Sequence, residues 1–301
     1  MHIPDGFLTN RIAGSLDVIS GATIFYAARR VKMDFSGRMV PIMGVLAAFI
    51  FAAQMLNFPI IGGTSGHLIG GTLLAILLGP MAGFLTLSTV VIAQALFLQD
   101  GGLVALGANV FNIGAITCFS GYAIFKLLGG GSAHGRRLLF AGFLAGWTSL
   151  MISSACCALE LGLSGAIPLH IGLTTMLGYH VVVGVIEGML TAGVLNFLLR
   201  VRPDLMKLNE LNQFGFADWV GAVVFVAVPV AILVLAGSSS LPDPLERLLA
   251  LSPLISSSAQ SEDLFSKARY MDYLIRAVVF ILLIALGCVA TLVSRRRSSR
   301  P

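Results

Sequence analysis

Eight apolar runs of 17 to 31 residues occupy most of this sequence, and a membrane-spanning helix needs about 20 mostly apolar residues. Only 11% of the 301 residues are charged, whereas an average soluble domain is about 25% charged. So few charges cannot cover a soluble surface, which excludes a soluble enzyme, a disordered chain and a secreted disulfide scaffold. The sequence therefore predicts an all-α integral membrane protein. The runs are Ile12–Ala28, Val40–Phe58, Leu68–Leu98, Gly107–Leu128, Leu138–Leu159, Gly172–Leu199, Trp219–Ala236 and Tyr273–Val293.

The third run is too long for one crossing. As a single helix, its 31 residues would reach about 46 Å, against a hydrocarbon core of about 30 Å. Gly79 and Pro80 stand near its middle, where a helix would break or turn. Its first part, Leu68–Leu78, is too short to span alone, so we expect a short or re-entrant element buried in protein.

The positions of the basic residues favour two crossings for this run. With two crossings, 14 of the 19 lysines and arginines fall on one side of the membrane. Cytoplasmic loops carry the excess of positive charge, which places that side inside the cell. The sequence thus predicts a helical bundle of about nine spans in the cell inner (plasma) membrane, with the N-terminus outside and the C-terminus inside.

Polar segments divide the chain into three parts. We expect seven spans in residues 1–205, a basic cytoplasmic linker at 206–216, and a two-span module at 217–301 with an outer loop at 238–271. The four cysteines lie in apolar runs without metal-ligand spacing, so they are interpreted as small buried hydrophobic residues.

Two of the five histidines have settings that suit metal chelation. No signal peptide precedes the first run, and the large His2 side chain disfavours removal of Met1, so Met1 is expected to be the mature N-terminus. The Met1 amine, the deprotonated His2 amide and the His2 Nδ1 atom can form two chelate rings in one plane. His67 follows the glycine-rich GGTSG on the same outer face and can supply a fourth nitrogen. Planar nitrogen ligation suits Ni(II) or Cu(II), although an N-terminal histidine is more often simply solvated.

His180 and Glu187 form a possible intramembrane polar pair, seven residues apart on one helical face. Hydrogen bonding between helices is the preferred interpretation, ahead of a direct role in transport. An intramembrane enzyme using these two residues is a distant alternative, because no nucleophile accompanies them. A third possibility is an uncoupled channel, but the spans contain no repeated ring of polar groups that could line a pore. The sequence has no P-loop, so ATP-driven transport would need another subunit.

The sequence resembles the CbiM/NikM family in four stretches that follow the family's order. They are MHIPDGFL at the N-terminus, FPIIGGTSGHLIGG at Phe58–Gly71, LFLQDGGLVALGANVFNIG at Leu96–Gly114, and HVVVGVIEGMLTA at His180–Ala192. Members of this family are substrate-binding (S) components of energy-coupling factor (ECF) transporters for cobalt or nickel. The resemblance covers about residues 1–205. The C-terminal part resembles the small CbiN/NikN partner, although its PDPLE has Pro244 where that partner usually has glycine.

The resemblance implies a metal site, a substrate and an assembly. In the family, the metal is held by the N-terminal amine, the second residue's amide and imidazole, and the histidine of GTSGH, here Met1, His2 and His67. Nickel is the favoured substrate because the geometry is planar, with cobalt for cobalamin supply as the alternative. The implied partners are a transmembrane coupling (T) subunit of CbiQ/NikQ type and ATPase subunits of CbiO/NikO type. For this chain itself the resemblance implies no enzyme activity, no organic cofactor and no nucleic-acid partner. Residues predicted to hydrogen-bond the imidazoles are Asn57, Gln99, Asp100 and Asn109.

Overall fold

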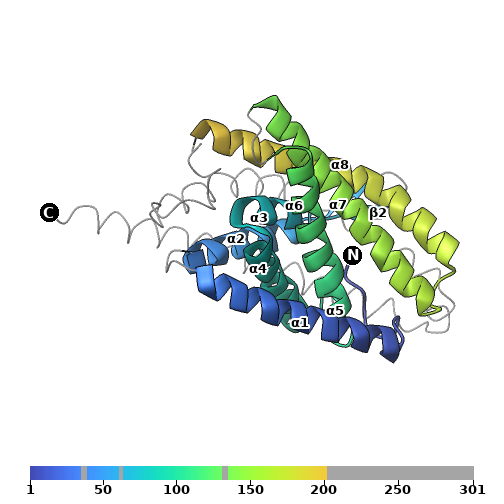
Figure 1. Ribbon diagram of the computed structural model, residues 1–301. Helices are drawn as coiled ribbons and strands as arrows, with labels where there is room; N and C mark the ends of the chain where they lie inside the picture. Colours follow the sequence, from blue (N-terminus) through green and yellow to red (C-terminus); the bar gives the residue numbers. More distant parts are fainter. Residues whose placement is uncertain (35–38, 61–63, 131–134, 202–301) are drawn as a thin grey trace.

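A computed structural model describes residues 1–34, 39–60, 64–130 and 135–201 of the chain. The predicted linker at 206–216 and the module at 217–301, with its loop at 238–271, lie outside the described residues. Within them the chain is helical apart from one small hairpin (Figure 1). The helical segments are α1 (Asn10–Asp34), α2 (Met39–Gln54), α3 (Gly71–Leu78), α4 (Pro80–Ala93), the π-helix η1 (Gln94–Leu98), α5 (Leu106–Asn109), the π-helix η2 (Val110–Ile116), α6 (Thr117–Leu127), α7 (Arg136–Leu163) and α8 (Leu169–Val201).

The long third run breaks where the sequence predicts. Helix α3 ends at Leu78 and α4 begins at Pro80, which occupies the first helical position, where its missing N–H costs nothing. With eight residues, α3 is about 12 Å long and cannot cross a membrane alone. Seven of those eight residues are buried, so α3 is a short element inside the protein. Whether the whole run crosses twice stays a prediction.

The run predicted at Val40–Phe58 is helical only as far as Gln54. It is followed by β1 (Phe58–Ile60), which pairs antiparallel with β2 (Thr64–Gly66), so that Phe58 lies opposite Gly66. The prediction of continuous helix over this run is wrong in its last four residues, because the residue before Pro59 is disfavoured in a helix and Phe58 pairs with Gly66 in the hairpin. The hairpin ends directly before His67 and brings that residue beside Met1.

Helices α7 and α8 form a closely packed pair, seen together in Figure 1. A Cβ added at Gly188 would lie 2.6 Å from the Phe143 carbonyl oxygen, and a Cβ added at Gly146 would lie 3.3 Å from the Gly188 Cα. Small residues allow such close approach of membrane helices, where van der Waals packing replaces the hydrophobic drive. The close packing of this pair gives α8 a fixed position beside the N-terminus.

Four described helical segments are long and apolar enough to cross a membrane: Pro80–Leu98, Leu106–Leu127, Arg136–Leu163 and Leu169–Arg200. Val40–Gln54 is apolar but shorter. Helix α1 contains the predicted run Ile12–Ala28 and has 25 residues, but its charged ends and Asp17 make it less apolar. The described residues therefore hold at least four candidate spans, while the count of nine and the orientation stay predictions.

Basic residues lie at the same end of several helices. Arg29 and Arg30 are near the end of α1, Arg136 begins α7, and Arg200 is in the last turn of α8. The opposite ends meet the N-terminal segment, because the Thr9 N–H, just before α1, donates to Ser164 Oγ, just after α7, at 3.2 Å. Arg11, at the start of α1, lies near the N-terminal segment, whereas the other basic residues named here lie at the opposite helix ends.

Candidate metal site

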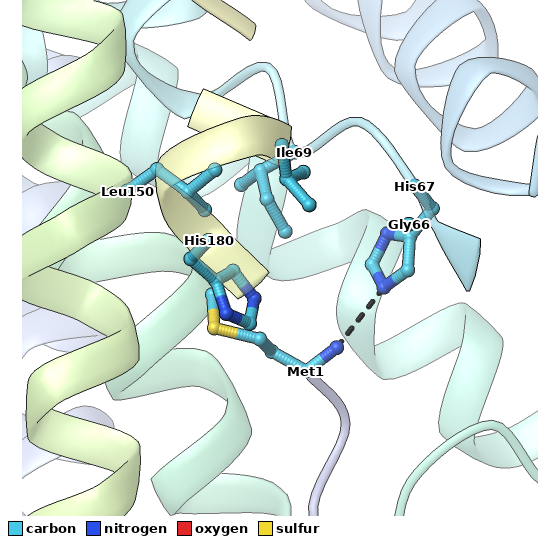
Figure 2. Close-up of a pocket in the computed structure, with 7 residues that line it drawn as sticks. Met1, Gly66, His67, Ile69, Leu150 and His180 are labelled. Atoms are coloured by element: carbon cyan, nitrogen blue, oxygen red, sulfur yellow. Dashed lines mark hydrogen bonds between the residues drawn. The ribbon is translucent and has the colours of Figure 1, made fainter. Parts of the chain in front are cut away.

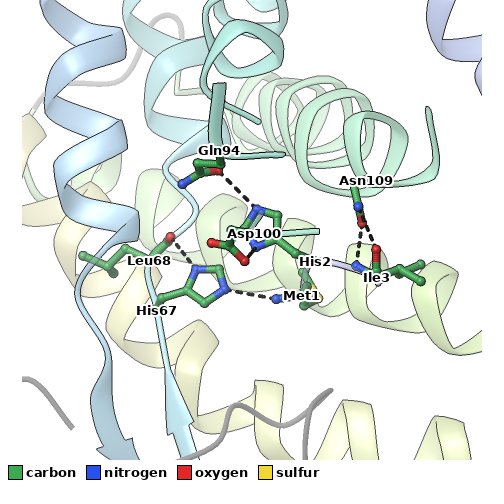
Figure 3. A network of polar contacts seen from close by, with 8 residues as sticks. All are labelled: Met1, His2, Ile3, His67, Leu68, Gln94, Asp100 and Asn109. Carbon is green, nitrogen blue, oxygen red and sulfur yellow. Dashed lines mark hydrogen bonds and ion pairs between the residues drawn. The ribbon is translucent and has the colours of Figure 1, made fainter. Parts of the chain in front are cut away.

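The first three residues are buried inside the helical bundle. Met1 is 3% exposed, His2 8% and Ile3 0%. A chain terminus is ordinarily solvated and poorly ordered unless other groups hold it. The burial of a charged amine and an imidazole at the terminus therefore needs specific partners, and the structure supplies several (Figure 3).

The Met1 amine donates a hydrogen bond to His67 Nε2 at 3.0 Å. On the other side of the same ring, His67 Nδ1 lies 3.1 Å from the Leu68 carbonyl oxygen, to which it donates. The carbonyl therefore selects the tautomer that carries its proton on Nδ1, and the Nε2 lone pair faces the amine. Residues 66 positions apart in sequence thus present two nitrogens to one point.

The His2 ring lies almost parallel to the His67 ring, with centroids 5.5 Å apart and an interplanar angle of 19°. His2 Nε2 lies 3.2 Å from Gln94 Oε1 and donates to it, while His2 Nδ1 lies 3.3 Å from Asp100 Oδ1. Each nitrogen of the His2 ring thus faces an oxygen atom of a neighbouring side chain. A metal bound at Nδ1 would keep the bond from Nε2 to Gln94, which fixes the ring's orientation.

Two polar side chains anchor the segment that carries these nitrogens. Asn109 makes a reciprocal pair with Ile3: its Oδ1 accepts the Ile3 N–H at 2.7 Å, and its Nδ2 donates to the Ile3 carbonyl at 3.0 Å. Asp5 accepts three backbone N–H groups, from Leu103, Val104 and Ala105, at 2.8 to 3.2 Å. Helix α5 and the loop before it therefore hold the N-terminal segment at Ile3 and at Asp5.

Glycine is required where this loop approaches the segment. The Gly102 N–H donates to the Ile3 carbonyl at 2.9 Å, and a Cβ at Gly102 would overlap the Asp5 carboxylate and backbone nitrogen. Gly101 has φ +94°, and a Cβ there would meet Asn109 Nδ2 at 2.7 Å. The close approach explains why two glycines follow Asp100.

If this site holds a divalent metal ion, as the family resemblance implies, Gly102→Ala is expected to weaken binding of that ion about tenfold, because the added methyl pushes the N-terminal segment away from the loop and from His67. The affinity is measured by calorimetric titration of the purified full chain with Ni²⁺. Gly178→Ala in α8 is the matched control, since no atom lies within 4 Å of its added Cβ. Equal affinity in both variants would contradict the packing argument.

Both π-helices begin beside residues that hold the N-terminus. Gln94, the partner of His2, is the first residue of η1, and Asn109, the partner of Ile3, directly precedes η2. Single π-turns are frequent at functional sites because the inserted residue re-aims neighbouring side chains. The irregular backbone at both positions is consistent with a demand for particular side-chain directions.

A small cavity of about 10 Å³ adjoins the Met1 amine and the His67 ring (Figure 2). This is about the space of one water molecule, which excludes an organic ligand of drug size. Helix α8 contributes His180 to its lining, and His180 Nδ1 donates to the Met176 carbonyl at 2.7 Å in its own helix. No hydrogen bond joins His180 to Glu187 among the described residues; Glu187 instead accepts the N–H groups of Ile69 and Gly70.

The structure brings most of the predicted residues together. Met1, His2 and His67 meet, Asp100 lies beside His2, and Asn109 binds the Ile3 backbone rather than an imidazole. No described hydrogen bond joins Asn57 or Gln99 to either histidine; Gln99 ends η1 with φ 54°. The described residues contain no group of three or more His, Cys, Asp or Glu side chains that could hold a metal. A metal here would therefore need main-chain nitrogens.

Sequence reasoning missed Gln94. It is fully buried within an apolar run, and a glutamine at a fully buried position in a membrane helix is costly unless it is hydrogen-bonded. The presence of a glutamine within this apolar run was the one sequence feature that pointed to a buried hydrogen bond, but it did not identify His2 as the partner.

A family model described as the cobalt uptake substrate-specific transmembrane region, CbiM, matches residues 2–205. The chain belongs to the CbiM family. It is therefore a multi-pass membrane component of transition-metal uptake and not an enzyme, and the CbiM family implies ECF assemblies for nickel or cobalt.

Similar proteins extend this result. A putative metal transport protein of Haloquadratum walsbyi is 44% identical over 208 residues, covering 68% of this chain and 93% of that protein. A probable fused nickel transport protein, LarMN, of Lactiplantibacillus plantarum is 31% identical over 297 residues, covering 91% of this chain and 89% of that protein. The second match runs well beyond residue 205 and supports a fused C-terminal module resembling the CbiN/NikN partner. A crystal structure of a truncated transition metal transporter aligns with TM-score 0.61 at 33% identity, over 66% of this CbiM chain and 99% of that one.

Proposed function

We propose that this chain captures Ni²⁺ from outside the cell in a planar site of four nitrogens. The ligands are the Met1 amine, the deprotonated His2 amide, His2 Nδ1 and His67 Nε2. The observation that carries the proposal is the 3.0 Å approach of the Met1 amine to His67 Nε2, in a ring whose Nδ1 is engaged by Leu68. Two ligands on adjacent corners of a square, each about 2 Å from the metal, lie about 3 Å apart.

The remaining ligands follow from covalent geometry. The amine and amide of an N-terminal X-His unit close a five-membered ring with the metal, and the amide and Nδ1 close a six-membered ring. His67 then occupies the corner opposite the amide and next to the amine. The Asp100 carboxylate beside His2 offsets positive charge as the cation enters.

Nickel is proposed ahead of cobalt because planar nitrogen ligation suits Ni(II). Calorimetric titration of the purified full chain with Ni²⁺ and with Co²⁺ is expected to give the tighter binding for nickel. LarMN, similar over most of this chain, is named as a nickel transport protein, which supports the same choice. Tighter binding of Co²⁺ would overturn the choice of nickel and favour cobalt.

Metal capture is expected to release at least one proton at neutral pH, because the His2 amide must lose its proton before its nitrogen can bind a metal. Because protons are products of binding, the affinity falls as pH falls, at least about tenfold for each unit below pH 7. Titrations in buffers of different ionisation enthalpy count the protons. An affinity that does not change between pH 6 and 8 would argue against amide ligation.

The wider assembly is part of the proposal. The N-terminus lies outside and the basic ends of α1, α7 and α8 lie inside, within a bundle of about nine spans. The basic side faces a CbiQ/NikQ-type T subunit and CbiO/NikO-type ATPase subunits, which supply the energy for release. Residues 206–216 act as a linker to a two-span CbiN/NikN-like module at 217–301.

A further inference from the structure

Glu187 is a buried carboxylate in the middle of α8, with only 2% of the residue exposed. Each of its oxygens accepts one backbone N–H: Oε2 from Ile69 at 2.9 Å and Oε1 from Gly70 at 2.6 Å. A buried charge is costly unless it is hydrogen-bonded, and bonds to a charged acceptor are about twice as strong as neutral ones. The carboxylate therefore binds firmly to the segment that directly follows His67.

The same segment orients the His67 ring. The Leu68 carbonyl accepts a hydrogen bond from His67 Nδ1 at 3.1 Å, and the next residue, Ile69, donates its N–H to Glu187. On the other side, Gln54 Nε2 in α2 donates to the Ile69 carbonyl at 2.8 Å. The backbone at Leu68–Gly70 is thus held between α2 and α8, and its position decides where the imidazole points.

We infer that Glu187 is a positioning residue, which ties the loop after His67 to α8 and so holds His67 Nε2 within reach of the Met1 amine. The inference rests on the proposed function, because it assigns Glu187 a task in that same metal site. It differs from the expected His180–Glu187 pair, since the partner of Glu187 is the loop that carries a proposed ligand.

The arrangement also provides a route for release. The amine, the amide and the first imidazole all lie on the N-terminal segment, which is held by α5 and the loop before it. His67 is held separately, through Glu187, by α8, whose basic end at Arg200 faces the proposed partners. Movement of α8 away from the N-terminal segment would withdraw His67 alone and leave a three-nitrogen site of lower affinity.

Glu187→Gln is expected to raise the Kd for Ni²⁺ about tenfold to a hundredfold. The NH₂ group of the glutamine would face the N–H of Ile69 or Gly70, two donors that repel each other, so the loop after His67 must shift. Calorimetric titration of the full chain is performed in the parent and in the His67→Ala background. If Glu187 acts through His67, its substitution changes the Kd less than about twofold once His67 is absent. Equal losses in the two backgrounds, or no loss in the parent, would overturn the inference.

Two further variants keep the test decisive. Glu160→Gln is the matched control, since Glu160 is also a buried carboxylate, bonded to Asn112 Nδ2 at 2.6 Å in a different region, and its effects in the two backgrounds should be equal. If Glu187→Gln does not fold, Glu187→Asp carries the same cycle, because the charge stays but the shorter side chain draws the loop toward α8. Unchanged affinity in His67→Ala itself would instead reject the proposed function, so the two failures are distinguishable.

Discussion

Adding one residue ahead of Met1 is expected to weaken Ni²⁺ binding about 10³–10⁴-fold. The extension turns the amine at Met1 into an amide and moves the charged terminus about 3.5 Å along the chain. Both chelate rings depend on that amine being one residue from His2, and tethered ligands that act together exceed separate ones by about 10²–10⁴. The buried amine also loses its place, because Met1 is 3% exposed and leaves no room for a further residue. Titration of the purified full chain with Ni²⁺ measures the effect.

The control for this prediction is the same protein with its terminus restored. A fusion whose protease cuts directly before Met1 gives both forms from one preparation: the uncut chain has a blocked terminus, and the cut chain begins with the amine. Intact-mass measurement verifies each terminus. Equal Ni²⁺ affinity before and after cleavage would reject ligation by the amine, whatever the outcome at His67.

The parts of the fold that could be predicted from sequence are those that depend on local chemistry. The break in the third apolar run is set by Pro80, and the structure confirms it between α3 and α4. The hairpin after α2 was not predicted, because Phe58–Ile60 lies in an apolar stretch whose length and composition fit the end of a helix equally well. Short apolar segments are ambiguous in this way, since tertiary pairing decides their conformation.

The candidate site shows the same division. Met1 and His2 are neighbours in sequence, so their chelate geometry follows from covalent structure. His67 was a candidate for the fourth nitrogen because it follows GGTSG on the same predicted outer face, and the family resemblance then implied it as a ligand. Gln94 could not be found this way, because its contact with His2 spans 92 residues and depends on the π-turn that begins at that residue. Glu187 was singled out as an ionisable group in a span, yet its partners are backbone N–H groups, which no side-chain pattern reveals.

His67→Ala is expected to weaken Ni²⁺ binding about 10²–10³-fold while the protein stays folded. The substitution leaves the two chelate rings of Met1 and His2 intact, so the loss is smaller than with a blocked terminus. It also removes the acceptor of the Met1 amine, which lies 3.0 Å from His67 Nε2. A water molecule would replace the fourth nitrogen and weaken the ligand field, so the visible absorption of bound Ni²⁺ should move to longer wavelength.

The matched control is His170→Ala, which removes an exposed imidazole at the start of α8 and should leave both the affinity and the absorption unchanged. Circular dichroism and thermal unfolding of both variants separate loss of a ligand from loss of the fold. A His67→Ala protein that keeps the parent's absorption would mean that the fourth ligand is another group, even if its affinity had fallen. A protein that loses affinity and shows the shifted absorption places an imidazole nitrogen at the corner opposite the amide, where a displacement of α8 can remove it without disturbing the other three ligands.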